Sequence, residues 1–150
     1  MLIEKFITQV KKTPGKTAVK IGEKIFTYAE LDNYADRIAG AIESVWPAQV
    51  EKAQVGLLLD HGVEMIAAIL GVLKAGKVYV PLSTGYPLNR ISYMLEDSNS
   101  GLVIIDSKCT EKTKEMILAK HIGFLNIDEI GENSLNFAFH SKMGGKNAED

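Results

Sequence analysis

The sequence predicts an α/β fold with three layers (α/β/α), in which a mainly parallel sheet is covered by helices on both faces. Three apolar runs carry this prediction, separated by two helical patterns: Val55 to Asp60, Val78 to Leu82 and Leu102 to Asp106. The first and third runs have no polar residue at alternate positions, which is typical of parallel strands that are covered on both faces. Right-handed crossovers between successive strands are expected from strand twist.

The first part of the chain predicts a helix, a β-hairpin and a second helix. Leu2 to Val10 places apolar residues at helical spacing. Thr17 to Lys20 and Lys24 to Phe26 are β-favouring stretches on either side of a glycine turn, which predicts a short N-terminal hairpin. Thr27-Tyr28-Ala29-Glu30 matches the capping box, so a helix is expected to begin there. It should end near Trp46-Pro47, because proline disfavours helical geometry in the preceding residue.

The segment from Val63 to Leu73 is apolar around nearly its whole circumference, so a helix buried between the sheet and another layer is expected. Only Glu64 and Lys74 are expected to be exposed to solvent. The next strand is predicted to end at Pro81, where the chain leaves the sheet. Pro87 is expected in the first turn of the following helix, where a missing backbone donor is tolerated.

The last third of the chain predicts a helix from about Thr110 to Lys120 and a fourth strand from His121 to Ile127. Residues 141–150 are polar and unpatterned, and we expect them to form a disordered tail. The length predicts one domain over residues 1–150, large enough to bury a substantial core. The prediction is therefore of a single domain whose ordered part ends well before its last residue.

Composition and charge exclude several classes of protein. The chain has 46% hydrophobic and 24% charged residues with a net charge of −2, which gives no reason to expect binding to nucleic acid or anionic lipid. The longest apolar stretch is interrupted by Asp60, His61 and Glu64, and the N-terminus lacks the pattern of a signal peptide, so a cytoplasmic location is expected. A single cysteine, Cys109, excludes an internal disulfide.

The segment Gly71 to Lys77 has the spacing G-x-x-x-x-G-K of a phosphate-binding loop. A phosphate loop requires the order strand, loop, helix, so that amides at a helix N-terminus face the phosphate, and a Ser or Thr after the lysine. The predicted order here is helix, loop, strand, and position 78 is valine. We therefore interpret the segment as the end of a buried helix.

No other residues form a recognisable catalytic or metal-binding pattern. His61, His121 and His140 are scattered and show no metal-ligand spacing with Cys109. His61 follows Asp60 at the carboxyl end of a predicted strand, where α/β ligand sites gather, but we interpret Asp60 as the cap of the next helix. Cys109 follows a lysine near a helix start, which can lower a thiol pKa, and is interpreted as an ordinary side chain. The sequence thus assigns no catalytic, cofactor-binding or metal-binding residue.

Two stretches nevertheless resemble core motifs of the adenylate-forming enzymes, and within them the amino-acid adenylation domains of nonribosomal peptide synthetases. Phe26 to Leu31 (FTYAEL) resembles the first motif, L-T-Y-x-E-L, and Leu73 to Leu82 (LKAGKVYVPL) resembles the second, L-K-A-G-x-A-Y-V-P-I-D. The continuation, Tyr86 to Arg90 and Met94 to Ser98, resembles the peptide-synthetase branch more than the acyl-CoA ligases. The sequence departs from the family pattern at Val78, where alanine is usual, and at Ser83-Thr84, where Asp-Pro is usual.

The resemblance implies a parent enzyme of antibiotic biosynthesis. Such an enzyme uses ATP and Mg to convert an amino acid to an aminoacyl adenylate and pyrophosphate, and then passes the acyl group to a carrier-protein thiol. The family's phosphate loop, substrate pocket, nucleotide motifs and mobile lysine come later in its sequence and are not matched within residues 1–150. This chain is therefore expected to be a scaffold fragment from the N-terminal portion of the large subdomain, inactive by itself and without a cofactor of its own.

The expected partners are the remainder of the adenylation domain and the neighbouring carrier and condensation domains, with self-association through surface that the remainder would cover. Lys74 and Arg90 are interpreted as surface side chains or partners of turns. Two alternatives remain open: a self-sufficient interaction module without catalysis, and a fragment of an acyl-CoA or acyl-AMP ligase. The amino acid activated and the peptide product cannot be predicted, because the selecting residues lie outside the resemblance.

Overall fold

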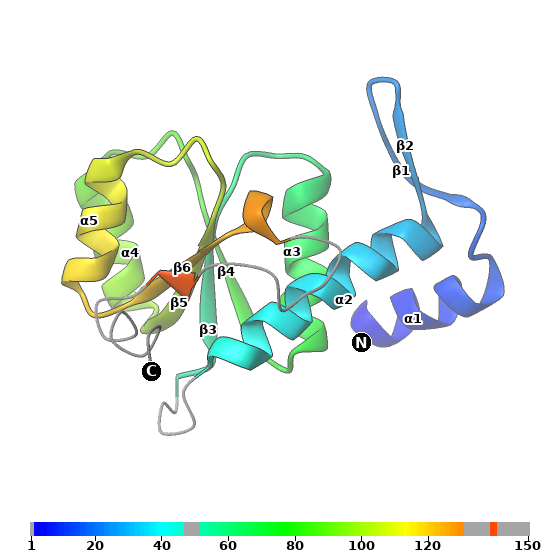
Figure 1. Ribbon diagram of the computed structural model, residues 1–150, viewed down its shortest axis with the longest axis horizontal. Coiled ribbons are helices and arrows are strands. Elements are labelled where there is room, and N and C mark those ends of the chain that lie inside the picture. The colour runs from blue at the N-terminus through cyan, green and yellow to red at the C-terminus, as the bar shows by residue number, and fades with distance from the viewer. Residues whose placement is uncertain (1, 47–51, 131–138, 141–150) are drawn as a thin grey trace.

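A computed structural model describes residues 2–46, 52–130 and 139–140, and shows the predicted α/β fold (Figure 1). The main sheet has the strand order β4-β3-β5-β6-β7, and β1 and β2 form a separate antiparallel hairpin. Strands β3 to β6 pair in parallel, as predicted, whereas β7 pairs antiparallel with β6. The predicted tail, 141–150, lies outside the described residues.

The predicted helices and strands are all present, with small differences at their ends, and the 3-10 turn at Ile127–Glu129 was not predicted. In chain order they are α1 (Leu2–Lys12), β1 (Thr17–Ile21), β2 (Lys24–Thr27), α2 (Tyr28–Val45), β3 (Gln54–Leu58), α3 (Val63–Lys74), β4 (Val78–Leu82), α4 (Leu88–Asp97), β5 (Ser100–Ile105), α5 (Glu111–Ala119), β6 (Gly123–Asn126), the 3-10 turn η1 (Ile127–Glu129) and β7 (Phe139–His140). None of the described helices combines the length and the apolar composition needed to cross a membrane.

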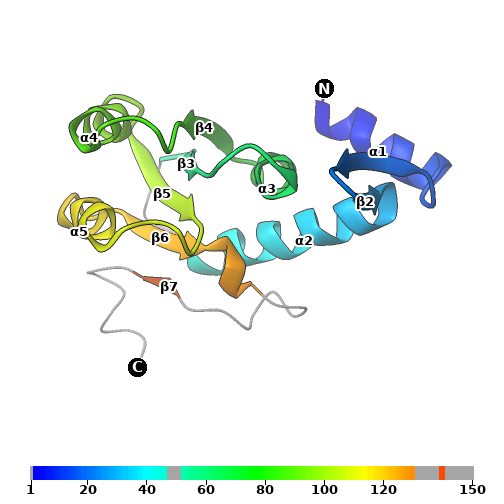
Figure 2. The same ribbon diagram turned by 90° about the horizontal axis from the view of Figure 1, so that it is seen from above.

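Helices cover the main sheet on both faces, as the three-layer prediction requires. Figure 2 shows α2 and α3 on one side of the sheet and α4 and α5 on the other. The buried apolar side chains accordingly form two clusters that share the sheet. The cluster under α2 and α3 includes Ile38, Ile42, Leu57, Ala68 and Ile104, and the cluster under α4 and α5 includes Leu82, Leu95, Val103, Ile105 and Ile117.

Helix α2 begins at the predicted capping box. The Glu30 backbone N–H donates to Thr27 Oγ1 (3.1 Å), and the Thr27 N–H donates to Glu30 Oε1 (2.9 Å). These two bonds satisfy donors that a helix start otherwise leaves free. The capping box therefore defines the start of the helix that packs on α3.

Helix α3 crosses α2 at Gly71, and Lys74 joins the two helices. A Cβ atom at position 71 would lie 2.7 Å from Ile38 Cγ2, so only glycine fits this approach without movement. Lys74 Nζ lies 2.7 Å from Asp32 Oδ1 and 2.8 Å from Asp36 Oδ1, and its side chain is only 14% exposed. The prediction that Lys74 is solvent-exposed was therefore wrong. Two carboxylates of α2 compensate the charge of its mostly buried ammonium group.

Strand β4 lies at one edge of the described sheet, and its bounds are those of the predicted run, Val78 to Leu82. Pro81 does not end the strand but lies within it, opposite Leu57 of β3, and the strand continues to Leu82. A proline is tolerated there because the open side of an edge strand needs no donor from it. Val78, at the start of the strand, is 51% exposed. Pro87 is the N-cap residue of α4 and not a residue of its first turn.

Candidate functional site

Polar side chains from three loops meet at the carboxyl edge of the sheet. Asp60 follows β3, Thr84 follows β4, and Lys108 follows β5. The Thr84 hydroxyl donates to Asp60 Oδ1 (2.5 Å), and Lys108 Nζ donates to Asp60 Oδ2 (3.2 Å). The Asp60 carboxylate therefore ties together loops that are distant in the sequence.

The electrostatics keep Asp60 ionised. The hydrogen bond from Thr84, followed by that from Lys108 and its positive charge, holds the pKa of the Asp60 carboxyl below its ordinary value. The same contact raises the pKa of Lys108. The side chains of Asp60 and Lys108 are 49% and 79% exposed, so solvent screens the pair and its contribution to folding stability is small. The pair is therefore not an anchor of the fold.

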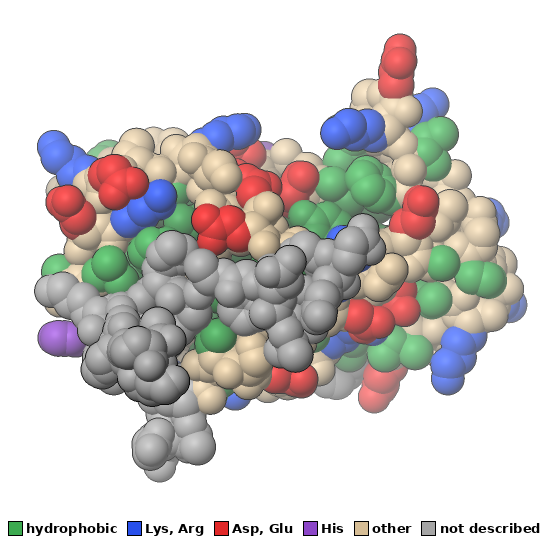
Figure 3. Space-filling view, in the orientation of Figure 1, with side chains coloured by type: hydrophobic (Ala, Val, Ile, Leu, Met, Phe, Trp, Pro, Cys, Tyr) green, Lys and Arg blue, Asp and Glu red, His purple; other side chains and the backbone are tan. Residues whose placement is uncertain are grey.

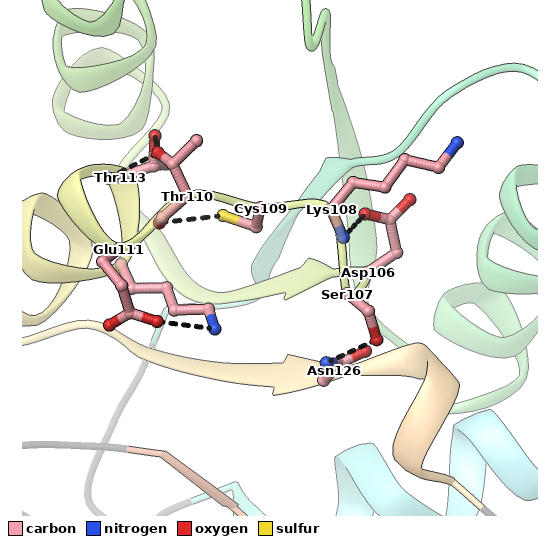
Figure 4. Close-up of polar contacts among 9 residues, drawn as sticks. Asp106, Ser107, Lys108, Cys109, Thr110, Glu111, Thr113 and Asn126 are labelled. Atoms are coloured by element: carbon pink, nitrogen blue, oxygen red, sulfur yellow. Dashed lines mark hydrogen bonds and ion pairs between the residues drawn. The ribbon is translucent and has the colours of Figure 1, made fainter.

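The loop that carries Lys108 is itself held by side chains. Asp106 Oδ1 accepts from the Lys108 N–H (3.0 Å), Asp128 Oδ2 accepts from the Ser107 N–H (2.9 Å), and Asn126 Nδ2 donates to Ser107 Oγ (3.3 Å). Figure 4 shows the Asp106 contact within this loop and the contact between Ser107 and Asn126 that joins the ends of β5 and β6. These contacts hold the backbone of the loop, while the exposed Lys108 side chain extends from it to Asp60.

Two cavities flank the Asp60 and Lys108 pair. The larger, about 310 Å³, is lined by Leu58, Asp60, Thr84, Tyr86, Leu88, Ile91, Asp106, Lys108, Cys109, Thr110 and Thr113. The smaller, about 160 Å³, is lined by Leu59, Asp60, His61, Glu64, Asp106, Lys108 and Asp128. In the face drawn in Figure 3, acidic side chains gather in the upper middle, over the carboxyl ends of the strands.

The structure corrects the interpretation of Asp60 as a helix cap. The N-cap residue of α3 is Gly62, and no side chain caps that helix. His61 is exposed beside it. The interpretation missed Thr84 and Lys108, although the polar residues that directly follow three predicted parallel strands were a usable signal.

Cys109 lines the larger cavity, and its thiol stays protonated. Burial raises the pKa of Cys109 more than Lys114 lowers it, and the carboxylates of Asp106 and Glu111 raise it further. The structure thus does not support a lysine-activated thiolate at this position. Among the described residues, no three or more His, Cys, Asp or Glu side chains form a group that could hold a metal ion.

The segment with phosphate-loop spacing is the carboxyl end of α3, as its interpretation from the sequence required. The helix ends at Lys74, and the amides of Ala75, Gly76 and Lys77 each donate to a carbonyl of its last turns at 3.0 Å. Lys77 Nζ lies 4.2 Å from the centroid of the Trp46 ring, in cation–π geometry. The amides and the lysine that a phosphate would need are therefore engaged within the protein.

Comparison with known proteins identifies the family. The model of a family described as "AMP-binding enzyme" matches residues 6–136. Tyrocidine synthase 3 of Brevibacillus parabrevis is 42% identical over 101 residues, which are 66% of this chain, and gramicidin S synthase 2 of Brevibacillus brevis is 40% identical over 111 residues, or 73%. This chain spans 2% of the length of each of these relatives.

Solved structures show the same fold. O-succinylbenzoate coenzyme A synthetase of Bacillus subtilis, in complex with AMP, has a TM-score of 0.71 and 26% identity, covering 83% of this chain and 31% of that one. The nonribosomal peptide synthetase FmoA3, in its α-methyl-L-serine-AMP bound form, has a TM-score of 0.71 and 26% identity. The match covers 91% of this chain and 15% of the FmoA3 chain. By its family match and its fold, this chain belongs to the AMP-binding enzymes.

Proposed function

We propose that this chain is the N-terminal scaffold portion of the large subdomain of an amino-acid adenylation domain in a nonribosomal peptide synthetase. The whole domain would convert ATP and an amino acid to an aminoacyl adenylate and pyrophosphate, and would then transfer the acyl group to a carrier-protein thiol. The observation that carries the proposal is the sequence identity of about 40% to tyrocidine and gramicidin S synthases. A fragment of an acyl-CoA ligase is the second candidate, because O-succinylbenzoate coenzyme A synthetase has the same TM-score (0.71) and identity (26%) to this chain as the peptide synthetase FmoA3.

The residues of both resembling motifs have structural roles in this chain. In the first motif, Thr27 and Glu30 close the capping box and Leu31 lies in the core. In the second, Lys74 joins α3 to α2, and Gly76 adopts a φ of 77° in the turn that ends α3, a conformation that favours glycine. A scaffold role explains these residues without any contact to substrate.

The segment with phosphate-loop spacing gives no support for MgATP binding by this chain. A phosphate site needs convergent free amides at a helix N-terminus, and residues 71–77 present the carboxyl end of a helix whose dipole opposes an anion. We therefore assign no step of the reaction to side chains of this chain. ATP and Mg²⁺ would bind to other parts of the parent enzyme.

The partners that follow from the proposal are the remainder of the adenylation domain and the neighbouring carrier and condensation domains, in the cytoplasm. The chain by itself would also self-associate. Its exposed large apolar side chains include Leu2, Ile25, Val78 and Tyr93. We propose that the remainder of the domain covers such side chains, and that without it they are available for self-association.

Calorimetry with MgATP, on the wild type and on Lys77→Ala, tests the scaffold assignment. The proposal predicts no saturable heat for either protein and no amino-acid-dependent pyrophosphate exchange by the chain alone. Micromolar affinity that disappears in Lys77→Ala would contradict the scaffold assignment. It would instead favour a self-sufficient module with its own nucleotide site.

A further inference from the structure

The connections of the sheet leave a crevice at the carboxyl ends of β3 and β5. These two strands are neighbours, but the chain leaves β3 for α3 on one face of the sheet and leaves β5 for α5 on the opposite face (Figure 2). The two loops therefore diverge. In open α/β sheets, ligands bind at such a topological switch point, because diverging loops leave space above the strand ends.

The two cavities lie at this switch point. Both are lined by Asp60 from the first loop and by Asp106 and Lys108 from the second. The contact between Asp60 and Lys108 therefore lies on the boundary between a cavity of about 310 Å³ and one of about 160 Å³. Both side chains are about half exposed or more, so opening this contact costs little and would join the two spaces.

The lining has one apolar end and one strongly acidic end. In the larger cavity the buried side chains of Leu58 and Ile91 form an apolar floor, with Tyr86 and Leu88 beside them. Around the two cavities together stand four carboxylates, those of Asp60, Glu64, Asp106 and Asp128, with Lys108 as the one lysine. Ligand sites of this kind combine an apolar wall with a few polar groups that set orientation, and the excess of carboxylates favours a cation.

We propose that this crevice binds a small amphipathic ammonium ligand, with its apolar body on Leu58 and Ile91 and its ammonium group on the Asp60 carboxylate. The Nζ atom of Lys108 already occupies the position of that ammonium, 3.2 Å from Asp60 Oδ2. The ligand would displace this internal cation, whose side chain can turn into solvent. This binding site does not depend on the adenylation reaction proposed above.

A titration of the complete 150-residue chain, followed by ¹H–¹⁵N NMR, tests the site with three probes of similar shape. We expect 2-phenylethylammonium to give saturable shifts at the amides of residues 58–62, 84–88 and 106–110, with a dissociation constant on the order of 1 mM for so small a ligand. The neutral 2-phenylethanol should bind about tenfold more weakly, because it lacks the charge-assisted hydrogen bond. The anion 3-phenylpropanoate should not bind.

Three variants identify the groups involved. Asp60→Asn should reduce the affinity for the ammonium probe to that for the alcohol, whereas Lys108→Gln should increase it by removing the competing cation. Asp97→Asn removes an exposed carboxylate at the far end of α4 and should change neither affinity. If Asp60→Asn did not fold, the comparison of the three probes on the wild type and on Lys108→Gln would still show whether the crevice selects an ammonium ligand.

Several results would overturn the proposal. Equal affinity for the three probes, or preference for the anion, would show that the carboxylates do not select the ligand. Absence of saturation with every probe, or shifts confined to other parts of the chain, would show that the crevice is not a site. Weaker ammonium binding in Lys108→Gln would show that the lysine holds the ligand and does not compete with it.

Discussion

Replacing Gly71 by alanine tests whether the crossing of α2 and α3 is as close as the structure shows. Helix propensity alone predicts that alanine at this interior position of α3 stabilises the protein by roughly 1 kcal/mol. The structure predicts the opposite sign. The new Cβ would lie 2.7 Å from Ile38 Cγ2, 2.8 Å from Ile38 Cβ and 3.0 Å from the Ala35 carbonyl oxygen.

The size of the destabilisation depends on whether the atoms that contact the new Cβ can move. Ile38 Cβ and the Ala35 carbonyl belong to or adjoin the α2 backbone, so no side-chain rotation relieves these contacts, and the helices must separate. Overpacking of this kind costs roughly 1–3 kcal/mol, and we place this case at the upper end because both partners are rigid. After the gain in propensity, the expected net loss of folding stability is about 2 kcal/mol, or a Tm lower by roughly 4–8 °C.

Urea and thermal denaturation monitored by circular dichroism measure this loss. Gly15→Ala is the matched control, because a Cβ at position 15 meets no atom within 4 Å and the residue does not have a positive φ. We expect the control to be neutral or to stabilise the protein by about 0.4–1 kcal/mol. A Gly71→Ala protein as stable as wild type, or more stable, would refute the close packing of α2 on α3.

Two further substitutions probe the contacts of α2. Thr27→Ala should lower the unfolding free energy by about 1 kcal/mol in urea denaturation, and Glu30→Gln, which keeps a hydrogen-bonding partner, should lower it less; equal losses would contradict the capping box. Lys74→Met should cost about 1–3 kcal/mol, because Asp32 and Asp36 lose the ammonium group between them. Burial lowers the pKa of Lys74, but the hydrogen bonds to the two aspartates outweigh it and raise the pKa above 10.5. The stability that Lys74 contributes is therefore present below pH 10.5 and is lost as the pH rises through the raised pKa, so stability curves of wild type and Lys74→Met should converge in that range.

The sequence predicts the strands of this fold well but not their order. Continuous apolar runs such as that of β5 identify covered parallel strands, and the capping box marks the start of α2. The apolar run of β4 is similar to the apolar runs of the central strands, yet β4 lies at the edge of the described sheet. Pro81 was the available signal, because a proline inside a strand is tolerated only where the open side needs no donor.

The candidate site is formed by contacts between residues that are distant in the sequence, which preferences based on neighbouring residues cannot predict. The capping preference applied to Asp60 compares it only with its sequence neighbours. Its actual partners, Thr84 and Lys108, come from two other loops, and they meet only because β3 lies between β4 and β5. Burial of Lys74 depends in the same way on carboxylates of another helix.

If this chain is the scaffold of an amino-acid-activating domain, it should support amino-acid-dependent ATP–pyrophosphate exchange within a chimera. Residues 6–136 would replace the matching segment of an adenylation domain of gramicidin S synthase 2, with the matching segment of O-succinylbenzoate coenzyme A synthetase as the control insert. We expect the first chimera to catalyse exchange with the amino-acid preference of the host enzyme, and the control chimera to catalyse much weaker exchange. A folded first chimera that lacks exchange, or one whose amino-acid preference has changed, would contradict the scaffold assignment.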